Sequence, residues 1–196
     1  GGSTRAAVNF ADPLDAFVAD RPAAPKAPGV TVEIRRGHAM GNAFAISGEV
    51  TAVEKALKIK GTPGAATSSK DYAALPLSPG QWLLVSSAPA DHGFGEKLTK
   101  RLKGSGYYSE QSDSRVIFRI SGRNARELVI KGCRLDLHPS VAKAGFCAQT
   151  QMAQIGVLIH QVEDAPVYDL FVYSGFAQEF AEWLDHSGAQ YGIRFK

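Results

Sequence analysis

The sequence contains little cysteine. Only Cys133 and Cys147 occur among its 196 residues, too few for a disulfide scaffold, and a reducing compartment disfavours a single bridge between them. Asp136 and His138 lie between the two thiols, so a metal site is the first hypothesis to test here. Zinc sites need three or four ligands, usually in close pairs, whereas these residues are spread over different predicted elements. We therefore expect no metal on this chain and interpret both cysteines as packing residues.

The sequence also lacks a strong charge excess and long apolar runs. Its formal net charge is +3, from 22 basic and 19 acidic residues, which does not predict a nucleic-acid partner. The apolar run 155–159 is far too short to span a bilayer, so no membrane partner is expected. The opening Gly1-Gly2-Ser3 resembles an expression-tag remnant and no secretory signal follows it. These features favour a cytoplasmic globular protein, and the 44% hydrophobic content is enough for a buried core.

Catalytic and cofactor-binding motifs are missing from the sequence. The stretch 64–70 resembles a phosphate-binding loop but lacks the glycine before Lys70, and no Gly-x-Gly-x-x-Gly follows a predicted strand. The stretch 172–176 lacks the first glycine of a nucleophile elbow, and we expect its Ser174 to cap a helix. The histidines have no acidic or cysteine partner at a recognisable spacing: His38, His92, His138, His160 and His186. We therefore predict no catalytic and no cofactor-binding residue.

Residues 1–29 form a separate N-terminal segment. Residues 21–28 are a Pro/Ala linker, which can hold neither a helix nor a central strand. Before it, Asp12 and Pro13 predict the start of a short helix. The apolar face of that helix consists of Leu14, Phe17 and Val18. So short a helix is marginal in water and needs a surface to dock on, which is either its own domain or a partner subunit.

Residues 30–196 alternate between predicted strands and helices. Apolar periodicity predicts strands over 30–34, 43–47, 81–86, 115–120, 146–153, 156–162 and 167–173. Helices are predicted around 50–57, 98–102, 125–129 and 176–184. Because some strands are joined directly and others through helices, the pattern indicates an α+β fold. The order of elements before residue 105 is echoed after it, so we expect one domain of two similar lobes, about 30–105 and 106–196.

A set of short motifs carries a family resemblance. Leu77-Ser78-Pro79-Gly80-Gln81-Trp82-Leu83-Leu84 resembles the Leu-Gly-Pro-x-x-Trp-Leu signature of the gamma subunit of heterotetrameric sarcosine oxidase. The following motifs continue the resemblance in order: Ile120-Ser121-Gly122, Ala125, Leu128, Lys131-Gly132-Cys133, Asp136-Leu137-His138-Pro139, Gly145, Gln149-Thr150, Asp169-Leu170 and Ser174-Gly175-Phe176-Ala177. The resemblance runs from about residue 75 to about residue 187, and its order makes it specific.

The resemblance implies a fold and an activity. The fold would be that of the folate-binding aminomethyltransferases, the glycine-cleavage T-proteins, in which two similar β/α lobes are intertwined. The complex would oxidise sarcosine to glycine with oxygen, giving hydrogen peroxide and a one-carbon unit that tetrahydrofolate can take up. FAD, FMN, NAD and zinc would be held by the alpha, beta and delta subunits, and the gamma chain would hold none. We carry no folate role onto Asp113, because no pterin-pocket motif surrounds it.

Three functions follow from these observations. The first is a non-catalytic gamma subunit that stabilises the cofactor-bearing subunits, inactive by itself, with Leu14, Phe17 and Val18 as the partner-docking hypothesis. The second is a stand-alone folate-binding or aminomethyltransferase-like protein. The third is the equivalent subunit of a dehydrogenase acting on another N-methyl amino acid.

Overall fold

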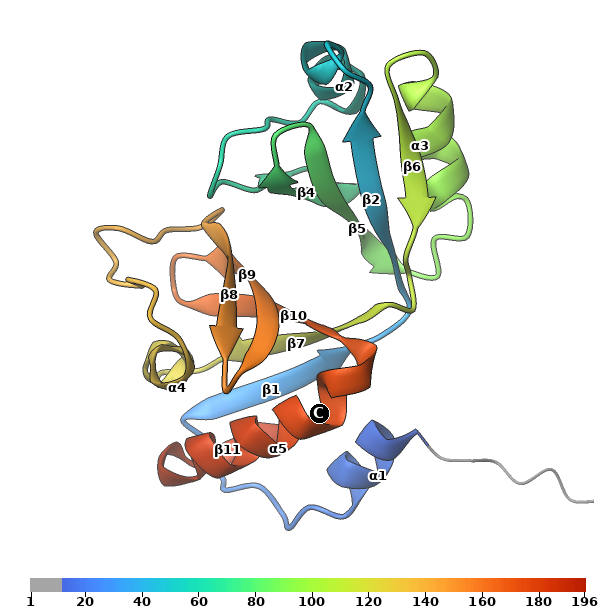
Figure 1. Cartoon of the computed structure of the whole chain (residues 1–196). Coiled ribbons are helices and arrows are strands. Elements are labelled where there is room, and N and C mark those ends of the chain that lie inside the picture. The colour runs from blue at the N-terminus through green and yellow to red at the C-terminus, as the bar shows by residue number, and fades with distance from the viewer. Residues whose placement is uncertain (1–11) are drawn as a thin grey trace, which may run out of the picture.

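The computed structural model describes residues 12–196 and contains two β-sheets with helices packed against them (Figure 1). The helices are α1 (Pro13–Ala19), α2 (Val50–Leu57), α3 (Phe94–Leu102), α4 (Ala125–Gly132) and α5 (Ala177–Gly188), with 3-10 turns η1 (Ser174–Phe176) and η2 (Ala189–Tyr191). The strands are β1 (Val30–Arg35), β2 (His38–Ala45), β3 (Thr67–Ser68), β4 (Tyr72–Ser78), β5 (Gln81–Pro89), β6 (Gly106–Glu110), β7 (Arg115–Ser121), β8 (Cys147–Met152), β9 (Ile155–Glu163), β10 (Val167–Tyr173) and β11 (Ile193–Phe195). The α+β class is confirmed.

The two sheets repeat one topology. The five-stranded sheet has the order β3-β4-β5-β2-β6, and the six-stranded sheet has the order β8-β9-β10-β7-β1-β11 when read in the matching direction. In each, a strand leads through a helix into a three-stranded meander, and a second helix leads into a last strand. The echo seen in the sequence is therefore a repeated supersecondary unit.

The expected boundaries of the lobes need correction. Strand β1 lies in the six-stranded sheet, between β7 and β11, whereas β6 lies in the five-stranded sheet beside β2. The first lobe is therefore residues 38–110, and the second is residues 115–195 with β1 added to it. Only Arg36 and Gly37 separate β1 from β2, so the chain crosses from one sheet to the other within two residues. This crossing intertwines the lobes, and local periodicity does not encode which sheet a strand joins.

Alternating side chains divide the interior into three layers. On β5, Trp82 and Leu84 face α2 and α3, whereas Leu83 and Val85 face the other sheet. On β7, Phe118 faces the helices α4 and α5, and Ile117 faces the five-stranded sheet. This is the two-residue period of a strand expressed in packing. Each sheet is thus covered by helices on its outer face and packs against the other sheet on its inner face.

Several elements differ from their predicted extent. Strand β2 begins at His38 rather than at Ala43, and β3, β4, β6 and β11 were not predicted. Strand β4 escapes detection because Pro76 interrupts it, and β11 because it is only three residues long. Ser174 does not cap α5, since its hydroxyl donates to the carbonyl of Asp113 at 2.7 Å. Within residues 12–196, no helix is long and apolar enough to cross a bilayer.

Candidate functional site

The N-terminal helix α1 docks on its own chain. Asp12 caps it, because its carboxylate accepts a hydrogen bond of 2.9 Å from the Leu14 amide. Leu14 is only 3% exposed and belongs to the core that β1, α4 and α5 form. Val18 is half-buried. This face therefore packs on its own domain through Leu14, while docking of the half-buried Phe17 and Val18 on a partner subunit stays a prediction.

Phe17 is held by a small aromatic cluster. Its ring meets that of Phe195 edge-to-face, with 5.2 Å between the centroids. The Arg21 guanidinium lies over both rings, 5.4 Å from the Phe17 centroid and 4.5 Å from the Phe195 centroid. Arg21 is also ion-paired with Asp185 of α5. Edge-to-face aromatic pairs and cation–π contacts are both stabilising, so this cluster fastens α1 to the C-terminal end of the chain.

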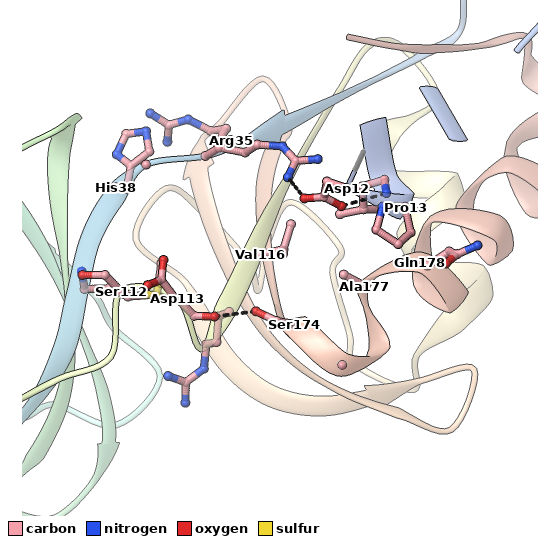
Figure 2. Close-up of a pocket in the computed structure, with 16 residues that line it drawn as sticks. Asp12, Pro13, Arg35, His38, Ser112, Asp113, Val116, Ser174, Ala177 and Gln178 are labelled. Atoms are coloured by element: carbon pink, nitrogen blue, oxygen red, sulfur yellow. Dashed lines mark hydrogen bonds and ion pairs between the residues drawn. The ribbon is translucent and has the colours of Figure 1, made fainter. Parts of the chain in front are cut away.

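A polar cavity of about 400 Å³ lies where the chain crosses between the lobes. Figure 2 shows Asp12 and Pro13, at the start of α1, on one side of it and Ser112 and Asp113 on the other, with Val116 and Ala177 between them. Arg36 on its wall is neutralised by Asp12 and by Asp15, the latter at 2.8 Å. The cavity thus lies between the N-terminal helix and the two segments that connect the sheets, 36–37 and 111–114.

The cavity does not fit a pterin. Among the described residues that line it there is no Phe, Tyr or Trp, and its walls carry several charged side chains. A flat heteroaromatic ring is usually held between apolar or aromatic surfaces, with a few polar groups at its edge. Asp113 is exposed, and its backbone carbonyl, rather than its carboxylate, accepts the hydrogen bond from the Ser174 hydroxyl. No folate chemistry is therefore assigned to this cavity.

A charged row crosses the inner face of the six-stranded sheet. The strand register places Arg119 between Glu33 and Asp169, and Asp169 beside His160. Asp169 is 5% exposed and accepts two hydrogen bonds from Arg119, at 2.7 and 2.9 Å. Arg35 adds a longer contact of 3.4 Å. A buried carboxylate paired in this way has its charge compensated, so the row can lie between the two sheets.

Two histidines flank this row. His38 is buried and hydrogen-bonds the Ser86 carbonyl through Nδ1 at 2.9 Å. Burial lowers the pKa of His38 below its ordinary value, and burial does the same to the pKa of His160. Asp169 opposes the shift at His160, while Arg119 adds to it. Both rings are therefore biased toward the neutral form.

The cysteine-containing stretch is architectural. Cys133 and Cys147 are both free thiols, and Cys147 packs between the two sheets. Burial raises the pKa of Cys147 to about 11, so it is a poor nucleophile at neutral pH. Asp136 accepts a hydrogen bond from the amide of His138 at 2.9 Å, which makes a local turn. In the described part of the chain, no three His, Cys, Asp or Glu residues gather closely enough to hold a metal ion.

An apolar groove of about 480 Å³ opens between the lobes. One wall is the end of β4, with Leu77, and the turn into β5, with Pro79. The other wall is strand β8 with Ala148 and Gln149. Gln149 reaches across and donates to the Leu77 carbonyl at 3.0 Å. The first family motif therefore contributes one wall of this groove, while its Trp82 is fully buried behind it.

Sequence reasoning missed both hollows, and only a weak signal could have found them. Their residues come from segments far apart in the chain, such as 36–38 with 174–178 and 63–64 with 147–149. The turn at Ser78-Pro79-Gly80 and the uncharged 147–152 stretch are each visible in the sequence, but nothing local shows that they face one another.

Comparisons with known proteins agree with this architecture. The sequence model of the sarcosine oxidase, gamma subunit family matches residues 36–190, and the match starts well before the first motif noted above. A search of curated proteins gave no significant match. A chain of the heterotetrameric sarcosine oxidase from Corynebacterium sp. U-96, in complex with pyrrole 2-carboxylate, is similar over 91% of this chain and 94% of that one, with a TM-score of 0.80 and 21% identity.

A second solved structure is similar over a shorter part of its own length. The glycine cleavage system aminomethyltransferase T from Bartonella henselae matches 86% of this chain with a TM-score of 0.62 and 14% identity. Only 48% of that protein is covered, so this chain spans about half its length. At these identities the two likenesses show the fold, and they confirm the predicted pair of intertwined lobes.

Proposed function

The chain belongs to the sarcosine oxidase gamma subunit family, and we propose that it is the non-catalytic gamma subunit of a heterotetrameric sarcosine oxidase. The observation that carries the proposal is the family match over residues 36–190, which spans both lobes and the crossing between them. The likeness to nearly the whole of one chain of a solved heterotetrameric sarcosine oxidase supports it.

The proposed complex oxidises sarcosine. Sarcosine, oxygen and water give glycine, hydrogen peroxide and formaldehyde, or a one-carbon unit carried by tetrahydrofolate. In this proposal the alpha, beta and delta subunits hold FAD, FMN, NAD and zinc. This chain contributes surface to the assembly instead, and its isolated form is colourless and inactive.

The chain has apolar side chains available for such a role. The exposed large ones are Ile46, Val50, Tyr107, Ile130, Val141, Tyr173 and Phe176. Obligate interfaces bury about 2,000 Å² or more, and their centres are apolar. A subunit that covers part of this surface with its partners would stabilise them by removing apolar area from water.

Co-expression tests the proposal. The chain is produced together with the other subunits of the same oxidase, and a parallel preparation omits it. We expect a complex of four different chains by native mass spectrometry, sarcosine-dependent peroxide formation, and a lower thermal midpoint when this chain is left out. Full activity and unchanged stability without it would contradict the proposed role.

The likeness to an aminomethyltransferase supports a second candidate, a stand-alone folate-binding protein. That candidate predicts tetrahydrofolate binding by the isolated chain, which calorimetry measures directly. The described wall of the polar cavity has no Phe, Tyr or Trp on which a pterin could stack, which argues against it. A third candidate, a related N-methyl amino acid dehydrogenase, is separated from the oxidase by offering the purified complex an artificial electron acceptor in place of oxygen.

A further inference from the structure

Strand β8 forms one edge of the six-stranded sheet and has a neighbour, β9, on one side only. In an antiparallel pair, every second residue directs its backbone groups to the neighbour and the others direct theirs outward. The Phe146 carbonyl points toward β9, because it accepts a hydrogen bond from the Gln161 amide. The amide of the next residue, Cys147, points outward and donates to the Gly64 carbonyl at 2.9 Å. The outward positions of β8 are therefore 147, 149 and 151.

The second half of this edge is unpaired. The backbone N–H and C=O groups of Gln149 and Gln151 make no hydrogen bond to any described residue. Both side chains are exposed. Unpaired backbone groups in a row are a template for another extended chain, because backbone donors and acceptors gain by pairing.

The edge carries none of the usual protection. Strand β8 reads Cys-Ala-Gln-Thr-Gln-Met and contains no charged residue and no proline. The other edges of the described sheets differ, because β3 and β11 are very short and β6 ends in Glu110. An uncharged edge of this length is normally covered.

The loop before β3 already pairs with the residues that lead into β8. Ala66 donates to the Gly145 carbonyl at 2.7 Å, and Ala65 forms an isolated antiparallel bridge with Phe146. The edge therefore has a geometry that accepts an extended chain. This natural pairing stops at Cys147, where the unpaired groups begin.

The apolar groove meets this unpaired edge at Gln149. Its walls include Val50, Leu77 and Pro79. Val50 is aliphatic and 37% exposed. Among the described lining residues only Glu54 is charged, and its carboxylate accepts a hydrogen bond from the Gly61 amide at 2.6 Å. The rest of the described lining is uncharged, so the groove suits an uncharged chain.

We infer that the edge of β8 at 149–151 and the adjoining groove bind one extended segment of a larger subunit of the proposed complex, by addition of a strand. The segment is uncharged, pairs its backbone with Gln149 and Gln151, and places an apolar side chain in the groove. This inference rests on the proposed function, since it names the surface through which the subunit is held.

The substitution Gln151→Pro tests the edge. Proline removes the outward N–H and adds bulk there, while an edge strand tolerates it when that N–H faces away from the sheet. Gln151→Ala keeps the N–H and is the matched control. In co-expression, we expect Gln151→Pro to weaken recovery or affinity for the larger subunits at least about tenfold, and Gln151→Ala to leave it unchanged. Circular dichroism and the thermal midpoint of each isolated variant check that it folds.

A second pair of variants tests the groove. Val50→Lys puts a charge on the apolar wall. Thr51→Lys puts the same charge on the next residue of α2, which is exposed and does not line the groove, so it is the matched control. We expect only Val50→Lys to weaken assembly.

If wild type assembles and both Gln151→Pro and Val50→Lys assemble equally well, the strand-addition inference is wrong and the proposed function stands. If wild type itself binds no larger subunit, the proposed function fails and the inference falls with it. A wild-type chain that dimerises alone, with the dimer lost in Gln151→Pro, would make a second copy the occupant and overturn the inference.

Discussion

Phe17→Ala is the change that most directly tests how the N-terminal helix is held. The Phe17 ring packs edge-to-face on Phe195 and lies under Arg21, so its removal takes away most of the aromatic cluster that fastens α1 to the C-terminal strand. Leu14 remains buried in the core and keeps part of the docking energy. The expected effect is therefore local weakening of α1, with the two lobes still folded.

The magnitude follows from partial burial. Replacing a fully buried phenylalanine by alanine costs about 3–5 kcal/mol of stability. An aromatic pair contributes about 0.5–1.5 kcal/mol beyond the area that it buries. Phe17 is half-buried, so we expect α1 to lose about 2 kcal/mol of docking free energy. Because about 1.4 kcal/mol is a factor of ten, the α1 amides should then exchange about 30-fold faster.

Hydrogen exchange measured by mass spectrometry on the isolated chain gives the exchange rate of the α1 amides directly. Peptides covering Pro13–Ala19 report α1, and peptides from β5 report the core. Phe176→Ala, which removes an aromatic ring that is 51% exposed, is the control and should leave α1 exchange unchanged. Unchanged exchange in Phe17→Ala would refute docking on its own chain and return Phe17 to the partner-docking hypothesis.

Two further predictions concern the charged row between the sheets. Asp169→Ala removes the carboxylate that accepts two hydrogen bonds from Arg119 and leaves only Glu33 opposite it in the register. Urea denaturation should therefore show a loss of about 3 kcal/mol, the lower end for a broken buried pair, and a loss below about 1 kcal/mol would contradict the pairing. Since burial lowers the pKa of His160 and His38 below the ordinary value of 6.5, the unfolded chain binds more protons than the folded chain just below that pH. The part of the free energy of unfolding that depends on these two histidines should therefore be fully present above pH 6.5. It should be lost as the pH falls from there toward the pKa values of the folded protein. His160→Gln should reduce the difference between the stability at about pH 7.5 and that at about pH 5.5. An equal fall in His160→Gln would show that the acid sensitivity lies elsewhere.

Local sequence patterns were enough for most of the fold. The alternation in 115–120 and 167–173 predicted β7 and β10, and the apolar stripe containing Phe180 and Leu184 predicted α5. The ordered motifs from residue 77 onward identified the family that the family model confirms. These features are encoded locally, because strand and helix periods are set by backbone geometry.

Pairing partners were not available from the sequence. Nothing local shows that β1 joins the sheet of β7 and β11, or that Asp169 meets Arg119, because both depend on register between distant segments. The expectation that Ser174 caps a helix failed for the same reason. Its hydroxyl bonds to the carbonyl of Asp113, which lies just before β7 and far away in the sequence.

The sequence by itself determined the α+β class, the doubled order of elements and the family. Only the tertiary structure shows that Leu14 and Phe17 pack against the core of their own chain, and that the unpaired edge at Gln149 and Gln151 meets an apolar groove at Gln149. Burial and exposure are properties of what packs against a residue, and for these residues the neighbours come from segments far away in the chain.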